Sequence, residues 1–195
     1  MTIVCIGDSL TYGYRVRRSE VWTKLMEKKY GIKVLNKGIC GDSTAGMLSR
    51  FYHDAVSERP SHVIIMGGTN DFIMEVPASV VKSNIATMVH QANACSIVPI
   101  IGIQIPTEPE TAKECWASIT DFYRVNDEIQ RYREWVLQFA QIFGVQVIDF
   151  YKGFVDYLRA GYGKKSDIYS DGLHLTAVGN EIIAAMVDEA VIRMR

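Results

Sequence analysis

The sequence lacks the features that mark secreted, membrane-spanning or nucleic-acid-binding chains. Its longest strongly apolar run, Ile97 to Pro106, is about half as long as a bilayer-spanning helix requires. No basic segment precedes the short apolar run at the N-terminus, no Asn-x-Ser/Thr sequon occurs, and the formal net charge is only −1. We therefore expect a cytoplasmic protein with no stable membrane insertion and no nucleic-acid partner.

The sequence also lacks any CxxC pair among its four cysteines, Cys5, Cys40, Cys95 and Cys115. Their wide spacing favours reduced thiols that pack as small apolar side chains. Two disulfides are the alternative that an even number of cysteines leaves open.

What the chain does contain is typical of a globular protein. It has 195 residues, of which 48% are hydrophobic and 22% are charged. This composition argues against disorder, and the length favours one domain, residues 1–195, with a full hydrophobic core.

Short apolar runs alternate with amphipathic stretches along the chain. Val- and Ile-rich runs predict five strands: Thr2–Ile6, Lys33–Asn36, His62–Met66, Ile97–Ile105 and Gln146–Phe150. Amphipathic stretches predict helices near Glu20–Tyr30, Thr44–Glu58, Ala78–Ala94, Asp121–Phe143 and Ala177–Arg193, the last with Thr176 as its N-cap. This alternation predicts an α/β fold: a three-layer α/β/α sandwich whose five-stranded parallel sheet has the order 2-1-3-4-5, as in flavodoxin-like proteins.

The least patterned segment is Pro106–Thr120, which follows the fourth predicted strand. It leaves the sheet at the edge where ligands bind in open α/β folds. We therefore expect it to form a lid or a pocket wall.

Polar, glycine-containing clusters follow the first three predicted strands and precede the last helix. They are Gly7-Asp8-Ser9-Leu10-Thr11, Asn36 to Asp42, Gly67-Gly68-Thr69-Asn70-Asp71 and Asp171-Gly172-Leu173-His174. In the predicted fold all four converge on one edge of the sheet. Together they supply the groups that nucleophilic acyl transfer needs.

Each group has a chemical task in such a reaction. A serine hydroxyl such as that of Ser9 attacks only when a base, here His174, takes its proton. Asp171 can hold the other imidazole nitrogen and so fix the tautomer. The backbone N–H groups of Ser9 and Gly41 and the side-chain amide of Asn70 are candidate oxyanion donors, and glycine leaves the approach to its N–H open.

Structural interpretations of the same residues stay open. Ser9 could be a turn residue, Asp171 and Gly172 a turn before a helix, and Asn70 with Asp71 a helix cap. Arg15, Arg17 and Arg18 could simply be solvated, or they could face an anionic part of a substrate.

Taken together, the four clusters resemble the conserved blocks of the SGNH hydrolases, also called GDSL esterases or lipases. The resemblance covers nearly the whole chain, and the letters of the name fall on Ser9, Gly41, Asn70 and His174. It implies an SGNH-type fold with Ser9 as nucleophile, His174 as base, Asp171 as the third triad member, and Gly41 and Asn70 as oxyanion donors. It implies no cofactor and no metal. The chain departs from a common form of the last block in having Leu175 rather than proline after the histidine.

These inferences predict a carboxylic ester hydrolase that acts on a small-molecule ester. We further expect Asp8, Leu10 and Trp116 to contact the substrate. Open alternatives are a carbohydrate O-acetylesterase, a thioesterase, an acyltransferase with a narrow substrate, and a catalytically silent small-molecule-binding domain. The residues do not distinguish these activities, and they do not indicate an oligomeric state.

Overall fold

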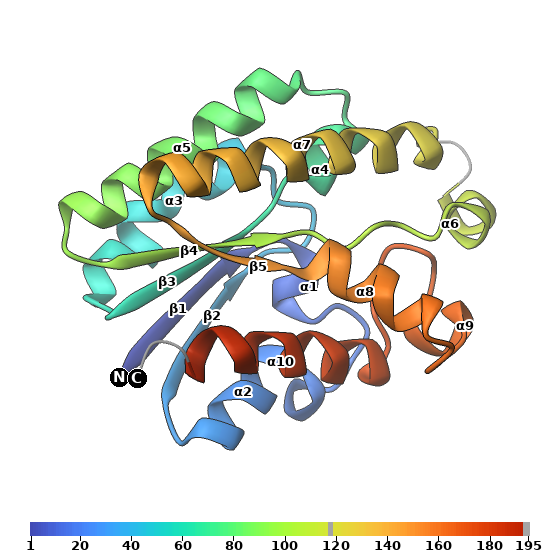
Figure 1. Ribbon diagram of the computed structural model, residues 1–195, viewed down its shortest axis with the longest axis horizontal. Coiled ribbons are helices and arrows are strands. Elements are labelled where there is room, and N and C mark those ends of the chain that lie inside the picture. The colour runs from blue at the N-terminus through green and yellow to red at the C-terminus, as the bar shows by residue number, and fades with distance from the viewer. Residues whose placement is uncertain (117–118, 193–195) are drawn as a thin grey trace.

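A central parallel sheet organises the molecule (Figure 1). The computed structural model describes residues 1–116 and 119–192. The strands are β1 (Thr2–Gly7), β2 (Lys33–Gly38), β3 (His62–Met66), β4 (Val98–Ile103) and β5 (Gln146–Asp149). They lie in the order β2-β1-β3-β4-β5, and every neighbouring pair is parallel, so the predicted fold class is confirmed.

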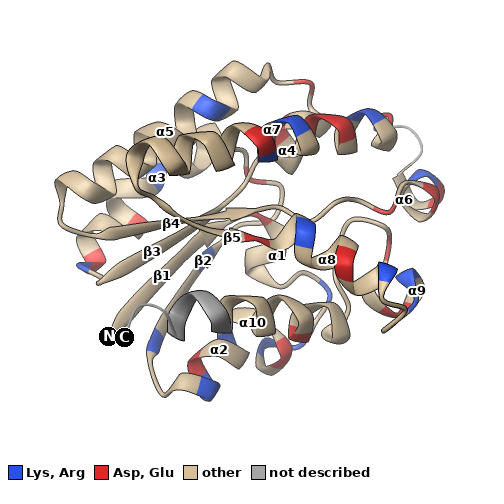
Figure 2. Ribbon diagram, viewed as in Figure 1, with Lys and Arg blue, Asp and Glu red and all other residues tan. Residues whose placement is uncertain are grey.

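Helices cover both faces of this sheet. One face packs against α2 (Trp22–Tyr30), α8 (Phe150–Arg159) and α10 (Ala177–Ile192), and the other against α3 (Thr44–Asp54), α5 (Ala78–Ala94) and α7 (Phe122–Phe143). Figure 2 shows charged residues of both signs on the helices and loops, while the strands carry few of them.

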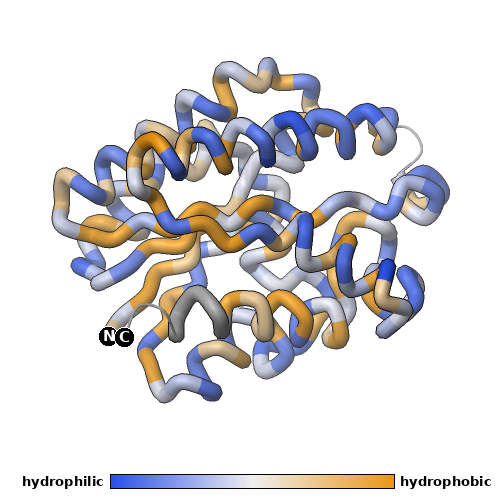
Figure 3. Tube along the Cα trace, in the orientation of Figure 1, coloured by the Kyte–Doolittle hydropathy of each residue, from blue (hydrophilic) through white to orange (hydrophobic). Residues whose placement is uncertain are grey.

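The strands face two hydrophobic cores because successive side chains of a strand point to opposite faces. In β1, Ile3 and Cys5 join the core under α2 and α10, whereas Val4 and Ile6 join the core under α3, α5 and α7. Strands buried on both faces need near-continuous apolar sequence, and Figure 3 shows this hydrophobicity along the central strands.

Several predicted boundaries were close, but the helices between β5 and the last helix were missed. The prediction treated the chain after β5 as a loop up to the last helix, but α8 begins directly at Phe150 and α9 (Lys165–Ile168) follows it. Asp149 starts α8 by accepting a hydrogen bond from the N–H of Lys152 at 3.0 Å, and Phe150 and Phe154 are buried beneath it. Gly153 interrupts the helical pattern of the sequence, which is why α8 was not predicted. A Cβ at this position would lie 2.5 Å from the side chain of Met186, so the glycine allows α8 and α10 to pack closely.

The segment 106–120 also differs from the prediction of an unpatterned loop. Its middle forms α6 (Pro109–Trp116), and the carboxylate of Glu108 accepts from the N–H of Thr111 at the start of this helix at 2.8 Å. Proline fits the first helical position because its missing N–H has no helical partner there. Residues 117–118 of this segment, like the expected helix end at Arg193, lie outside the described residues.

Two further short helices, α1 (Ser9–Tyr12) and α4 (Thr69–Ile73), complete the α-helices of the described residues. The four cysteines are free, as the reduced interpretation predicts. Within the described ranges, no helix is long and apolar enough to cross a membrane.

Candidate active site

Ser9 stands at the beginning of α1, directly after β1. The carboxylate of Asp8 caps this short helix by accepting from the N–H of Leu10 at 2.9 Å. The indole N–H of Trp22 donates to the carbonyl of Leu10 at 3.1 Å and braces the turn from α2. Ser9 is 8% exposed, so its hydroxyl is held in a nearly buried turn at the carboxyl edge of the sheet.

The loop before α10 brings an imidazole to this hydroxyl. Nε2 of His174 lies 3.0 Å from Oγ of Ser9, and Nδ1 of the same ring lies 2.9 Å from Oδ2 of Asp171. Oδ1 of Asp171 also accepts from the backbone N–H groups of Leu173 (3.1 Å) and His174 (2.8 Å). One buried carboxylate thus orients both the ring and the backbone that carries it.

Gly172 fits this loop for two reasons. Its φ is +80°, which L-residues with a side chain rarely adopt. A Cβ there would lie 2.3 Å from the backbone nitrogen of Ala112 and 2.6 Å from the carbonyl oxygen of Glu108. The carbonyl of Gly172 in turn accepts from the N–H of Glu108 at 2.8 Å, so α6 packs directly against the loop that carries His174.

The ionised form of Asp171 is favoured although the residue is only 1% exposed. Burial alone would raise the pKa of Asp171, but the hydrogen bonds from the ring and backbone of His174 outweigh it and hold the pKa below its usual range. Nη1 of Arg15 lies 3.3 Å from Oδ2 of Asp171. Arg15 has a positive φ of 64°, which places a half-exposed cation beside the buried carboxylate.

The arginines after the Ser9 turn do not act as one group. Arg15 reaches Asp171, whereas the guanidinium of Arg18 lies over the ring of Tyr12, 3.8 Å from its centroid, and donates to the Tyr12 carbonyl. Arg17 precedes a short 3₁₀ turn that ends at Glu20. The structure therefore brings one of the three predicted cations to the candidate triad.

Aromatic rings flank His174. The Tyr14 ring centroid lies 4.5 Å from that of the imidazole, and the Trp116 ring approaches edge-on at 6.1 Å. These contacts restrict rotation of the ring, which leaves it aligned between Ser9 and Asp171.

The loop between β2 and α3 carries the predicted backbone donor Gly41. Its φ is +76°, but a Cβ there would meet nothing within 4 Å. Glycine is therefore favoured here by backbone conformation, and the hollow beside it leaves the approach to its N–H open. Nδ2 of Asn70 donates to the carbonyl of Asp42 at 2.9 Å and has a second hydrogen to give.

Asp71 ties the two candidate donor segments together. It accepts from the N–H and hydroxyl of Thr44, at 2.9 and 2.7 Å, where α3 begins just after the Gly41 loop. Burial raises the pKa of Asp71, and the bonds from Thr44 work in the opposite direction. Asn70, the next residue, is thereby kept beside the Gly41 loop.

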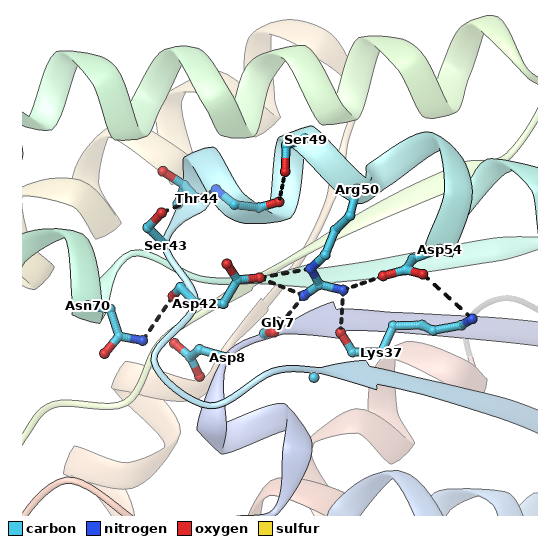
Figure 4. A network of polar contacts seen from close by, with 12 residues as sticks. Gly7, Asp8, Lys37, Asp42, Ser43, Thr44, Ser49, Arg50, Asp54 and Asn70 are labelled. Carbon is cyan, nitrogen blue, oxygen red and sulfur yellow. Dashed lines mark hydrogen bonds and ion pairs between the residues drawn. The ribbon is translucent and has the colours of Figure 1, made fainter.

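Arg50 of α3 anchors the same loop from behind (Figure 4). Its guanidinium contacts the carboxylates of Asp42 and Asp54, at 2.8 and 2.7 Å, and donates to the carbonyls of Lys37 (2.8 Å) and Gly7 (3.1 Å). The side chain is only 16% exposed. One planar cation therefore joins the ends of β1 and β2 to the loop that holds Gly41.

A hollow of about 340 Å³ opens onto Ser9. It is lined by Asp8, Ser9, Leu10, Tyr14, Cys40, Gly41, Thr69, Asn70, Ile73, Trp116, Ile119, Leu173 and His174. All predicted site residues except Asp171 border it, and Asp171 stands behind His174. Among the three predicted substrate contacts, Leu10 and Trp116 offer apolar surface, whereas both carboxylate oxygens of Asp8 already accept protein hydrogen bonds.

A larger hollow, of about 910 Å³, lies between α8 and α10. Its lining contains no serine, cysteine or histidine, so it holds none of the nucleophiles or bases of the candidate site.

Gln104 is a buried residue beneath the site that the sequence interpretation missed, because it was assigned to a strand running to Ile105. The strand ends at Ile103, and Gln104 lies at the same sheet edge as Ser9, with 1% of its surface exposed. The available signal was a single polar residue in an otherwise apolar run.

Comparison of the sequence and fold with known proteins identifies relatives of this chain. The model of the GDSL-like lipase/acylhydrolase family matches residues 5–182. Esterase TesA of Pseudomonas aeruginosa is 32% identical over 111 residues, which cover 54% of this chain and 55% of that protein. The match thus spans about half the length of this curated relative.

Solved structures match over almost the full chain. The lipase/acylhydrolase from Enterococcus faecalis has a TM-score of 0.76 at 25% identity and covers 97% of this chain and 94% of its own. A member of the lipolytic protein G-D-S-L family from Veillonella parvula has a TM-score of 0.83 at 23% identity, with 99% of each chain covered. The latter likeness concerns the fold.

Proposed function

Because the chain belongs to the GDSL-like lipase/acylhydrolase family, we propose that it is a serine esterase that cleaves carboxylic esters through an acyl-enzyme on Ser9. The observation that carries this proposal is the continuous chain of contacts from Ser9 Oγ to His174 Nε2, at 3.0 Å, and from His174 Nδ1 to Asp171, at 2.9 Å. This is the arrangement in which a hydroxyl can lose its proton as it attacks.

In the first half-reaction, Oγ of Ser9 attacks the ester carbonyl carbon and its proton passes to Nε2 of His174. The carbonyl oxygen gains the negative charge of the tetrahedral intermediate. The N–H groups of Ser9 and Gly41 and the amide of Asn70 are the donors that we assign to this oxygen. The ester C–O bond then breaks, and His174 gives its proton to the leaving alcohol.

In the second half-reaction, water replaces the alcohol. His174 takes a proton from the water as its oxygen attacks the acyl carbon. Collapse of the second tetrahedral intermediate breaks the bond to Ser9, and the proton returns to Oγ. Throughout, ionised Asp171 stabilises the imidazolium and holds Nδ1 as the donor nitrogen.

We expect the size of the hollow to limit the acyl group. Its volume of about 340 Å³ lies at the small end of the range of about 300–1,000 Å³ that is typical of small-molecule sites. Its apolar lining includes Leu10, Ile73 and Trp116. This space suits short and medium acyl groups, while a palmitoyl chain exceeds it.

Hydrolysis of p-nitrophenyl acetate, butyrate, octanoate and palmitate tests this proposal. We expect kcat/KM to rise from acetate to octanoate and to rise no further for palmitate, because each methylene that finds apolar contact contributes about 0.8 kcal/mol and methylenes outside the hollow contribute nothing. Absence of hydrolysis of all four esters would contradict the proposed function. A maximum at palmitate would contradict the assignment of the acyl group to this hollow.

A further inference from the structure

Gln104 links the two sides of the candidate site from beneath. Its Nε2 donates to Oδ2 of Asp8 at 2.6 Å, and its Oε1 accepts from the N–H of Thr69 at 2.7 Å and from the Thr69 hydroxyl. Gln104 and Asp8 are each only 1% exposed. A buried amide therefore joins the end of β4 to the turns that follow β1 and β3.

The orientation of the amide is set by its partners. The backbone N–H of Thr69 can only donate, so the oxygen of Gln104 must face it and the nitrogen must face Asp8. Asp8 then acts as acceptor toward both the N–H of Leu10 and the amide of Gln104. In this series of hydrogen bonds each side-chain atom acts either as donor or as acceptor. Replacing one oxygen by nitrogen, or the reverse, therefore breaks a bond.

The two ends of this link adjoin the groups whose separation matters for catalysis. Ser9 is the residue after Asp8, and Asn70 is the residue after Thr69. Resting on the proposed function, we propose that Gln104 is a positioning residue that fixes the Ser9 nucleophile relative to the Asn70 oxyanion donor. A misplacement of about 1 Å between reacting groups lowers rates by about 10²-fold, so loss of this link acts on kcat.

The charge state of Asp8 affects its hydrogen bond with Gln104. Burial raises the pKa of Asp8 to about 6, while the bonds from Leu10 and Gln104 favour the carboxylate. The other charged or titratable groups that act on it are His174, which lowers its pKa, Asp42, which raises it, and the thiol of Cys40. Above pH 6 the carboxylate predominates, and the amide of Gln104 is its matched donor.

A swap of the two side chains tests this role. In Asp8→Asn the new amide nitrogen either faces the amide nitrogen of Gln104 or replaces the oxygen that accepts from Leu10, so one bond is lost. In Gln104→Glu two carboxyl groups face each other. The double variant restores every bond: Asn at position 8 accepts from Leu10 and donates to Glu at position 104, which accepts from Thr69. We expect each single variant to lose about 10- to 100-fold in kcat at pH 8 with little change in KM, and the double variant to regain at least tenfold over the slower single variant.

The pH profile supplies a second readout. In Gln104→Glu the paired carboxyl groups share a proton at low pH, so the ratio of its kcat to that of the wild type should rise as the pH falls from 8 to 5. A merely structural defect would lower thermal stability without this pH dependence. Gln91→Glu is the matched control, because Gln91 is exposed on α5. We expect this variant to keep the kcat of the wild type.

The outcomes separate the two claims. A double variant that is as slow as the slower single variant, or a flat kcat ratio for Gln104→Glu, would overturn the role of Gln104 while an active wild type leaves the proposed function standing. A wild type without ester hydrolysis would overturn the proposed function, and the role of Gln104 with it.

Discussion

Replacing Ser9 by alanine is expected to lower kcat for p-nitrophenyl butyrate by at least about 10⁴-fold. The change removes one oxygen from a residue that is 8% exposed, and the backbone N–H that caps the oxyanion stays in place. The fold should survive, because the hydrogen bonds that hold this turn come from Asp8 and Trp22 rather than from the Ser9 hydroxyl. Steady-state kinetics with thermal unfolding of the same samples measures both effects.

Ser49→Ala is the matched control for this variant. Ser49 is exposed on α3, and its hydroxyl contacts only a nearby helix carbonyl, that of Gly46, among the bonds that the structure gives it. Its replacement should leave kcat within about twofold of the wild type, as expected for surface substitutions. Hydrolysis that persists in Ser9→Ala would show that another group is the nucleophile.

The second large effect is expected for Asp171→Asn, with kcat lowered by about 10⁴-fold. The new amide oxygen can still accept from the N–H groups of Leu173 and His174, so the loop keeps its shape. The amide nitrogen, however, takes the place of Oδ2 and donates to Nδ1 of His174. The ring must then carry its proton on Nε2, where it faces Ser9 as a donor and cannot accept the hydroxyl proton.

Asp156→Asn provides the comparison for loss of a carboxylate elsewhere. Asp156 lies on α8, is half exposed and pairs with Lys152 at the surface, so its replacement should leave kcat unchanged. If Asp171→Asn retained more than about a tenth of the wild-type kcat, the tautomer argument would fail.

The fold could be predicted because its signals are local. Each buried strand is a run of Val and Ile, and polar residues stop it, so the alternation of strands and helices is visible in the sequence. The order of the strands was expected from the flavodoxin-like arrangement, because right-handed crossovers alone allow several orders. α8 was missed because Gly153 interrupts its pattern, and only the side chain of Met186, more than thirty residues away, explains that glycine.

The candidate site was predictable in its residue types but not in its supports. Ser9, Gly41, Asn70 and His174 follow strand ends or precede a helix, which is where open parallel sheets gather ligand-binding groups. The amide of Gln104 and the guanidinium of Arg50 reach the site through side-chain geometry across several strands. No sequence spacing encodes such contacts. The contact of Arg15 with Asp171 likewise depends on the positive φ of Arg15, which the sequence does not predict.

Covalent trapping with diethyl p-nitrophenyl phosphate tests the central claim most directly. Oγ of Ser9 should attack phosphorus and expel p-nitrophenolate, leaving a stable diethylphosphoryl group because the oxyanion donors hold its oxygen while water attacks it poorly. Mass spectrometry of the digested protein should then find one such group per chain, on Ser9, with one equivalent of p-nitrophenolate released and no labelling of Ser9→Ala. An unlabelled wild-type chain, or a label on any other residue, would contradict the assignment of Ser9 as the nucleophile.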